Sequence, residues 1–354
     1  MQQGSLRGGF PEQPAGIVVR AWLLGLLLVG SEAVGSVIPV TTTVDEYGAG
    51  SDCSLREAIE SANTDTAFGG CPTGSGTDTV TLPAGTYTLT RAGSRENANA
   101  TGDLDITSAL TLSGTSGADV TIIDAGQLDR VADVTSTVTI TGVTLTGGQI
   151  ADDLTMPREW GAGVQSAGTL TLDHVVVSNN TGTGFARGGG LAVTGGTADV
   201  SDATFTVNTA TSGAGLYASF STTLTLVRGL VTANTATING SGAKGGALDV
   251  VGTATVMEST LSQNTAQLGG AFSVFGTLTL VNSTVSGNTT TDSSGGAAGV
   301  IFQNALTLLN VTVAGNTAQG GGTGGILVSG GTVTLRNTIL ADSAPAGGDC
   351  VGTI

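Results

Sequence analysis

Short stretches in which apolar residues alternate with threonine recur along the chain from Leu112 to its last residues. An alternation with a period of two is typical of β-strands. The second apolar residue of each stretch recurs every 24 to 32 residues, and such self-similarity indicates a solenoid, whose repeats bury their apolar faces only against their neighbours. We therefore predict strands that pair from coil to coil, with one aliphatic ladder inside. Its members are Leu112, Ile140, Leu172, Val200, Leu226, Val256, Leu280, Leu308 and Leu335.

An asparagine follows six consecutive ladder residues at a constant distance of eight residues. A constant offset places the six amides in the same turn of successive coils. Asparagine tolerates left-handed turn geometry and bonds readily to nearby backbone. We interpret the row as structural, each amide bonding its own backbone and the asparagine of the next coil; the alternative is a ligand-binding row. The six are Asn180, Asn208, Asn234, Asn264, Asn288 and Asn316.

Residues 36–79 have a different pattern, which predicts a short helix. Ser54 and Glu57 have the spacing of a capping box. The apolar residues that follow fall at i, i+3, i+4 and i+7, which gives one apolar stripe. Such a helix would cover the first coil, because a bare terminal coil invites aggregation. The stripe consists of Leu55, Ala58, Ile59 and Ala62.

The first 35 residues have the pattern of an export signal. Arg7 and Arg20 precede an apolar run at 21–30, and small residues follow at 33–35. A run of this length is too short to span a bilayer, and no later segment is long and apolar enough. We therefore predict a signal peptide at 1–35, an N-terminal cap at 36–79 and coils over 80–354.

Cysteine content and charge restrict the compartment and the partners. Three cysteines in an exported chain point to an oxidising compartment, where Cys53 and Cys71 can pair across a short loop and Cys350 is left over. The net charge is −16 with a single lysine, which argues against nucleic acid as a partner. An acidic surface would also repel polyanionic glycans unless a divalent cation such as Ca²⁺ intervened.

One string gives a resemblance to a known group of proteins. Residues 53–58 read CSLREA, and the chain resembles bacterial secreted proteins that carry an N-terminal CSLREA module before a right-handed parallel β-helix. The likeness continues through LPAGTYTLT, TGDLDIT, IIDAGQLDRV and GGDCVGTI. The coils are also similar to the repeats of chlamydial polymorphic outer-membrane proteins, through GGAL at 245–248 and FTVN at 205–208.

The resemblance implies an all-β fold, a right-handed parallel β-helix of the pectate-lyase-like type with a short N-terminal capping helix. It implies a protein that is secreted or held on the bacterial surface. It also implies further coils after Ile354, one of which would supply a partner for Cys350.

The longest variable loop spans 147–163 and carries an aromatic residue among charges. Variable loops on a rigid scaffold are common binding sites, and exposed aromatic rings suit sugars. We therefore predict an adhesin-like, monomeric scaffold that binds polysaccharide or host cell-surface glycans through the edge of the solenoid that carries this loop. The alternative is that the ring folds back over an apolar corner. The predicted contacts are Trp160, Arg158, Phe185 and Arg187.

A second hypothesis is a carbohydrate-active enzyme, either a polysaccharide lyase or a glycoside hydrolase. A lyase on this fold would need a base and carboxylates that bind Ca²⁺. Asp103 and Asp105 share a strand face and would have Asp124 near them in the next coil, so this trio is the predicted metal site. His174 has no predicted triad or metal partner.

Overall fold

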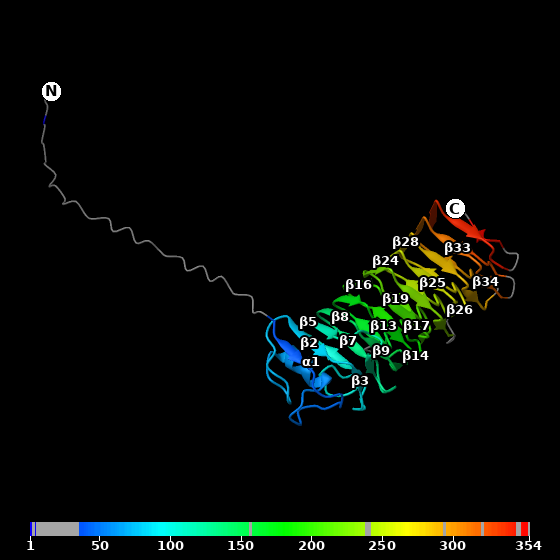
Figure 1. The fold of residues 1–354 in the computed structure, drawn as a ribbon. Helices are drawn as coiled ribbons and strands as arrows, with labels where there is room; N and C mark the ends of the chain where they lie inside the picture. Colours follow the sequence, from blue (N-terminus) through cyan, green and yellow to red (C-terminus); the bar gives the residue numbers. More distant parts are fainter. Residues whose placement is uncertain are drawn as a thin grey trace. The chain divides into compact units, whose positions relative to one another are not determined.

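The computed structural model describes residues 1, 4, 35–155, 158–237, 242–292, 295–319, 322–344 and 348–352. The predicted signal peptide lies almost wholly outside the described residues. The chain divides into two compact units, Met1–Glu32 and Ala33–Ile354, and every helix and strand below belongs to the second. In that unit the coils follow one another in chain order, from β2 to β34 (Figure 1).

Each regular coil passes through four parallel sheets in turn, named here A, B, D and C. Sheet A supplies the longest strands, mostly of five residues. Its residues alternate between inward and outward positions, so two side chains of each strand enter the core. The described strands of sheet A are β1 (Val37–Pro39), β2 (Asp78–Leu82), β5 (Leu110–Gly114), β8 (Thr137–Thr141), β12 (Thr169–Asp173), β16 (Thr197–Ser201), β20 (Thr223–Val227), β24 (Thr253–Met257), β28 (Thr277–Val281), β32 (Ala305–Leu309) and β36 (Thr332–Arg336).

Sheets B and D follow sheet A in the coil and flank the asparagine turn. The described strands of sheet B are β3 (Gly85–Thr88), β6 (Thr121–Asp124), β9 (Thr144–Thr146), β13 (Val176–Ser178), β17 (Thr204–Thr206), β21 (Leu230–Thr232), β25 (Thr260–Ser262), β29 (Thr284–Ser286), β33 (Thr312–Ala314) and β37 (Ile339–Ala341). Those of sheet D are β10 (Gln149–Asp152), β14 (Thr181–Gly184), β18 (Thr209–Ala210), β22 (Thr235–Ala236), β26 (Thr265–Ala266), β30 (Thr289–Thr290) and β34 (Thr317–Ala318).

Sheet C closes the coil, and its outer face carries most of the residues discussed below. Nearly all its strands have three residues. They are β4 (Leu104–Ile106), β7 (Ala132–Val134), β11 (Val164–Ser166), β15 (Leu191–Val193), β19 (Leu216–Ala218), β23 (Leu248–Val250), β27 (Phe272–Val274), β31 (Gly299–Ile301), β35 (Ile326–Val328) and β38 (Cys350–Val351).

The predicted aliphatic ladder is present in sheet A. Each member pairs in register with the next, from Leu112 against Ile140 to Leu308 against Leu335. All are buried except Leu335, which is half-buried near the end of the stack. The all-β parallel β-helix predicted from the period is therefore confirmed.

The asparagine ladder is present as well, with one correction to its backbone geometry. Asn208 donates its Nδ2–H to Oδ1 of Asn234 at 3.0 Å and to the carbonyl of Val177 at 2.9 Å. Its backbone N–H donates to the same Oδ1 at 3.0 Å. The left-handed residue of each turn is the one before the asparagine, such as Val207 (φ 57°) and Ala233 (φ 57°), and the ladder amides themselves have negative φ. The side chain, rather than the conformation, explains why asparagine is required.

The predicted capping helix is α1 (Leu55–Thr64), and both hydrogen bonds of its capping box are present. The disulfide between Cys53 and Cys71 fixes its start, with 4.5 Å between the two Cα atoms. Arg56 is fully buried and forms an ion pair with Asp45 at 2.8 Å. Its guanidinium also donates to the carbonyls of Gly102 and Asp103, so the helix is bonded to the first coils.

The described residues contain no helix that is both long and apolar enough to cross a membrane. Cys350, on β38, is half-buried and not in a disulfide.

Candidate functional site

The middle residues of the sheet C strands form one row on the outside of the coil stack. The residues on either side of each, such as Leu104 and Ile106, point into the core, so the middle residue points outward. Several members of the row are nevertheless buried, because neighbouring segments cover them. The row pairs in the order Asp105, Asp133, Gln165, Ala192, Tyr217, Asp249, Ser273, Val300 and Leu327.

The first coils of this row hold a group of carboxylates around one arginine. The guanidinium of Arg130 lies 3.3 Å from Asp103, 3.3 Å from Asp133 and 2.5 Å from Glu159. All four side chains are buried. The guanidinium of Arg130 therefore occupies the space between these carboxylates, which a bound metal ion would need.

Burial raises the pKa of several carboxyls in this group. The pKa of Asp105 is raised to about 7, although the backbone N–H of Asn99 opposes the shift. That of Asp129 is raised to about 6, mainly by burial, with Arg130 opposing it. Burial also raises the pKa of Asp103 well above its usual range. Near neutral pH this group therefore carries less negative charge than its composition suggests.

The trio predicted as a metal site is not brought together. Asp103 and Asp105 lie near Asp133, and their carboxylate oxygens are within 4.8 Å of one another. Asp124 is on sheet B, where its Oδ1 accepts the N–H of Gly126 at 2.9 Å. Because a coil has several sides, the next carboxylate along the chain faces another direction, and Asp133 takes the place expected for Asp124.

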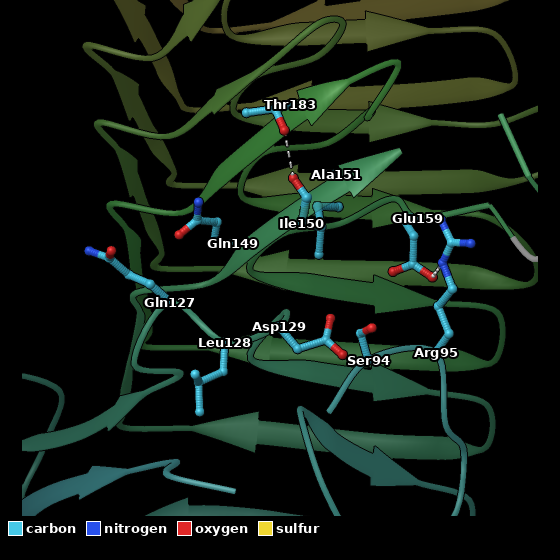
Figure 2. A pocket seen from close by; sticks show the side chains of 10 residues that line it. All are labelled: Ser94, Arg95, Gln127, Leu128, Asp129, Gln149, Ile150, Ala151, Glu159 and Thr183. Atoms are coloured by element: carbon cyan, nitrogen blue, oxygen red, sulfur yellow. Dashed lines mark hydrogen bonds and ion pairs between the residues drawn. The ribbon is translucent and has the colours of Figure 1, made fainter. Parts of the chain in front are cut away.

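A polar cleft of about 370 Å³ lies beside this group. Figure 2 shows Glu159 and Arg95 turned toward each other on one side, with an ion pair of 3.3 Å between them. Asp129 reaches the cleft from the segment between β6 and β7. The lining residues are Ser94, Arg95, Gln127, Leu128, Asp129, Gln149, Ile150, Ala151, Glu159 and Thr183.

The loop that carries Trp160 is held against the solenoid by Asp152. This buried carboxylate accepts the indole N–H of Trp160 at 3.0 Å and forms an ion pair with Arg158 at 2.7 Å. Trp160 is consequently half-buried, and the guanidinium of Arg158 lies 5.5 Å from its ring centre. Trp160 therefore folds back onto the solenoid, but it contacts charged and aromatic side chains and not the apolar corner of the alternative prediction.

Arg187 connects that loop to sheet C. Its guanidinium lies 5.2 Å from the ring centres of both Trp160 and Tyr217, and it donates to the Tyr217 hydroxyl at 2.6 Å. Trp160 and Tyr217 meet edge to face with centres 5.4 Å apart. The structure thus brings Arg158, Trp160 and Arg187 together. Phe185 is half-buried and makes no aromatic or cation contact with them among the described residues.

A second cavity, of about 340 Å³, opens next to Arg187; we call it the Lys244 cavity. The ammonium of Lys244 lies 4.9 Å from the ring centre of Phe275 and 5.6 Å from that of Phe302. These two rings stack on each other with centres 4.5 Å apart. The lining consists of Arg187, Ser212, Phe220, Lys244, Asp249, Val251, Phe275, Gln303 and Asn304.

Asp249 forms part of this lining although it is only 3% exposed. Its Oδ1 accepts no hydrogen bond from any described residue. Burial raises its pKa to about 6, while Arg187, Ser273 and Lys244 act in the opposite direction. A buried carboxylate oxygen without a hydrogen bond is costly, so the position of Oδ1 beside a cavity marks a place where a ligand can donate one.

Phe220 stands beside the same cavity and is 78% exposed. A further hollow of about 390 Å³ shares Phe220, Val251 and Asn304 with the Lys244 cavity. An exposed ring that lines two neighbouring hollows, one with both apolar and charged side chains, suits a sugar chain, whose apolar faces stack on aromatic rings and whose hydroxyls need polar partners.

His174 lies on an exposed turn, where a neighbouring carboxylate is its polar partner. Its Nδ1 lies 2.8 Å from Asp173, and this hydrogen bond raises the histidine pKa. Asp202 is close to both, but Arg228 already pairs with it at 2.5 Å. The cluster is a charged row on an exposed turn.

Sequence reasoning did not select several residues of the Lys244 cavity. Asp249 and Tyr217 are adjacent in the outward row, and Phe275 and Phe302 each follow a strand of sheet C directly. Their spacing along the chain differs from coil to coil. Tyr217 lies nine residues after Asn208 and Asp249 lies fifteen residues after Asn234, so an alignment of the coils on the asparagine ladder does not place them in one row.

No protein-family model matches this sequence, and a search of curated proteins gives no match. Among solved structures, the chain is similar to the crystal structure of pectate lyase Pel9A, at 13% sequence identity and a TM-score of 0.42. The likeness covers 76% of this chain and 73% of that one. The fold assignment rests on the strand pairing described above.

Proposed function

We propose that this protein is a secreted or cell-surface β-helix scaffold that binds carbohydrate, as polysaccharide or host-cell glycan, at the Lys244 cavity. The observation that carries the proposal is the combination, in one cavity, of the exposed ring of Phe220 with the buried carboxylate of Asp249, whose Oδ1 accepts no hydrogen bond from the described residues. The ring offers a stacking surface, and the carboxylate offers a buried hydrogen-bond acceptor.

The surrounding contacts support a preformed site. Arg187 is fixed by Trp160 and Tyr217, while Lys244 is fixed over the rings of Phe275 and Phe302. Side chains that are held in place lose little conformational freedom when a ligand binds. Trp160 acts here as a positioning residue for Arg187, which revises its predicted role as the sugar platform.

A panel of neutral and acidic polysaccharides, tested by affinity electrophoresis of the purified chain, examines this proposal. We expect retention on at least one glycan, and we expect Phe220→Ala to weaken it roughly threefold to tenfold, the range of an aromatic contact. Ile339→Ala, which removes an exposed apolar side chain from sheet B, is the matched control and should change nothing. Equal effects of the two substitutions would contradict the proposal.

A glycoside hydrolase at the polar cleft is the second candidate, and one observation favours it. The carboxyl of Asp129, with its pKa raised to about 6, shares the cleft with Glu159, which two arginines hold in ion pairs. A carboxyl that titrates near neutral pH, such as Asp129, together with a carboxylate paired with arginines, such as Glu159, is the pattern of a catalytic acid and base. Release of reducing ends that Asp129→Asn abolishes would support this activity, and no release would count against it.

We also propose that the chain is a member of the CSLREA group and reaches the surface through an N-terminal signal. The described cap supports the first point, since Arg56 and Glu57 of the CSLREA string make the bonds that attach α1 to its surroundings. Mass spectrometry of the protein exported from bacteria tests the second. A mature N-terminus near Ser36 is expected, and an intact N-terminus on the exported protein would contradict it.

A further inference from the structure

The Lys244 cavity contains two cations without ion-pair partners. Among the described residues, neither Lys244 nor Arg187 forms a salt bridge, whereas Arg56, Arg130 and Arg158 each do. Lys244 is the only lysine of a chain with a net charge of −16. Asp249 is near enough for both cations to oppose the rise of its pKa, but no carboxylate of the described residues forms a salt bridge with either of them.

The ammonium of Lys244 is held in place but not saturated. It lies over Phe275 and Phe302, which fix it without accepting a conventional hydrogen bond, and no described side chain or carbonyl accepts from it. A lysine ammonium has three N–H donors. A bound anion can accept from these donors through charge-assisted hydrogen bonds.

Arg187 and Lys244 are arranged along the stack. Arg187, Ser212 and Lys244 occupy equivalent positions in consecutive coils. Two coil steps of about 4.8 Å put the backbones of Arg187 and Lys244 about 10 Å apart. The two cations can therefore contact neighbouring units of an extended chain that runs along the stack.

The carboxylate of Asp249, whose Oδ1 accepts no hydrogen bond from the described residues, restricts the chemistry of the ligand. A small inorganic anion would meet the cations but would be repelled by Asp249 and would offer it no donor. A neutral sugar would donate hydroxyls to Asp249 and leave Lys244 without an acceptor. A sugar that carries both an anionic group and hydroxyls satisfies both kinds of group.

We propose that the Lys244 cavity selects acidic glycans, with the anionic group of a sugar unit bound by Lys244 and Arg187 and a hydroxyl donated to Asp249. This inference rests on the proposed carbohydrate binding and adds the class of ligand. It also revises the expectation that an acidic chain needs a bridging divalent cation, because the cavity supplies its own positive charges despite the overall negative charge.

The test compares three matched probes by isothermal titration of the full chain without divalent cations. They are oligomers of a hexuronic acid, their methyl esters and the corresponding neutral hexose oligomers. We expect esterification to weaken binding roughly tenfold or more, as for the loss of a charge-assisted hydrogen bond. A sulfated glycan tests whether the anionic group must be a carboxylate, and inorganic sulfate should bind weakly or not at all.

Variants separate the contribution of Lys244 from a general effect of charge. Lys244→Gln should lower affinity for the uronate roughly tenfold and leave that for the neutral oligomer unchanged, whereas Lys244→Arg should retain uronate binding. Arg336→Gln removes an exposed cation on β36 and is the matched control. Circular dichroism should show the same fold in all variants.

The outcomes are distinguishable. If all three probes bind equally and Lys244→Gln changes nothing, acidic selectivity is wrong while carbohydrate binding stands. If inorganic sulfate binds as tightly as the uronate, the site is an anion site and not a sugar site. If no glycan binds, the proposed function fails, and the inference fails with it.

Discussion

Buried charges along the outward row of sheet C are balanced in two different ways. Near the cap, Arg130 holds Asp103, Asp133 and Glu159 in one ion-pair group. Further along, Asp249 is just as buried but has neither an ion pair nor a hydrogen bond to Oδ1 among the described residues. The first group is balanced by its own ion pairs, although Oδ2 of Asp103 and Nε of Arg130 make no hydrogen bond with any described residue. Asp249 has no ion pair in the described part of the chain and lines a cavity, which is why it is the better candidate for binding.

The burial of Asp249 predicts a pH dependence of stability. Its folded-state pKa of about 6 lies above the ordinary value of 3.8, so its neutral form favours folding. That contribution is fully present below about pH 4 and is lost as the pH rises through about 6, a change of about 3 kcal/mol. Asp249→Asn should therefore raise the free energy of unfolding relative to the native chain at pH 8 and much less at pH 4.

Urea denaturation of both proteins between pH 4 and 8 measures this difference directly. Other carboxyls with raised pKa, such as Asp105, contribute equally to both proteins and cancel in the comparison. A difference that does not change with pH would show that Asp249 is not held in a low-dielectric environment.

The same residues show where sequence reasoning reached its limit. The constant offset of the asparagines predicted the ladder, because every coil needs the same turn, and the capping box predicted α1. The cavity could not be predicted in this way. Tyr217 and Asp249 are adjacent in space but 32 residues apart, and only the inter-coil register shows that they share a row. The alternation of apolar and polar residues predicts whether a side chain points into the coil or out of it. It does not predict which of the four sheets carries that side chain.

At the scale of elements, the asparagine turn joins each coil to the next by side-chain bonds in addition to the strand pairing. Asn234 accepts from the N–H and the Nδ2 of Asn208, and it donates to Asn264 and to the carbonyl of Phe205. Because these groups are buried, no water replaces a lost partner. A second row, of exposed asparagines, occupies the turn between sheets A and B, where Asn310 bonds to Asn282 at 2.9 Å.

The two rows allow a controlled prediction. Asn234→Ala should lower the free energy of unfolding by about 3 kcal/mol, since it leaves several buried groups without partners at about 1–3 kcal/mol each. Asn310→Gly removes an exposed bond of the same type and keeps the positive φ of 56° accessible, so it should cost well under 1 kcal/mol. Urea denaturation monitored by circular dichroism measures both. Equal costs would mean that burial does not determine the strength of the ladder.

At the scale of the whole solenoid unit, stability depends on contacts between neighbouring coils. Leu226 is fully buried and pairs with Val200 on one side and Val256 on the other. Leu335 pairs with Leu308, and among the described residues of sheet A no strand follows it. In a solenoid each coil contacts only its neighbours, so the same substitution should have different effects at these two positions.

Leu226→Ala should lower the free energy of unfolding by about 2–5 kcal/mol, because it leaves a cavity that two neighbouring coils enclose. Leu335→Ala should cost roughly 1 kcal/mol or less, since that side chain is already half exposed. Denaturation followed by both circular dichroism and the fluorescence of Trp160 measures the two effects. If the circular dichroism and fluorescence transitions coincide, the solenoid unfolds as one cooperative unit. If the circular dichroism of the Leu226→Ala protein is lost at a lower denaturant concentration than its Trp160 fluorescence signal, its coils separate at the weakened interface. Equal costs at the two positions would contradict the dependence on neighbouring coils.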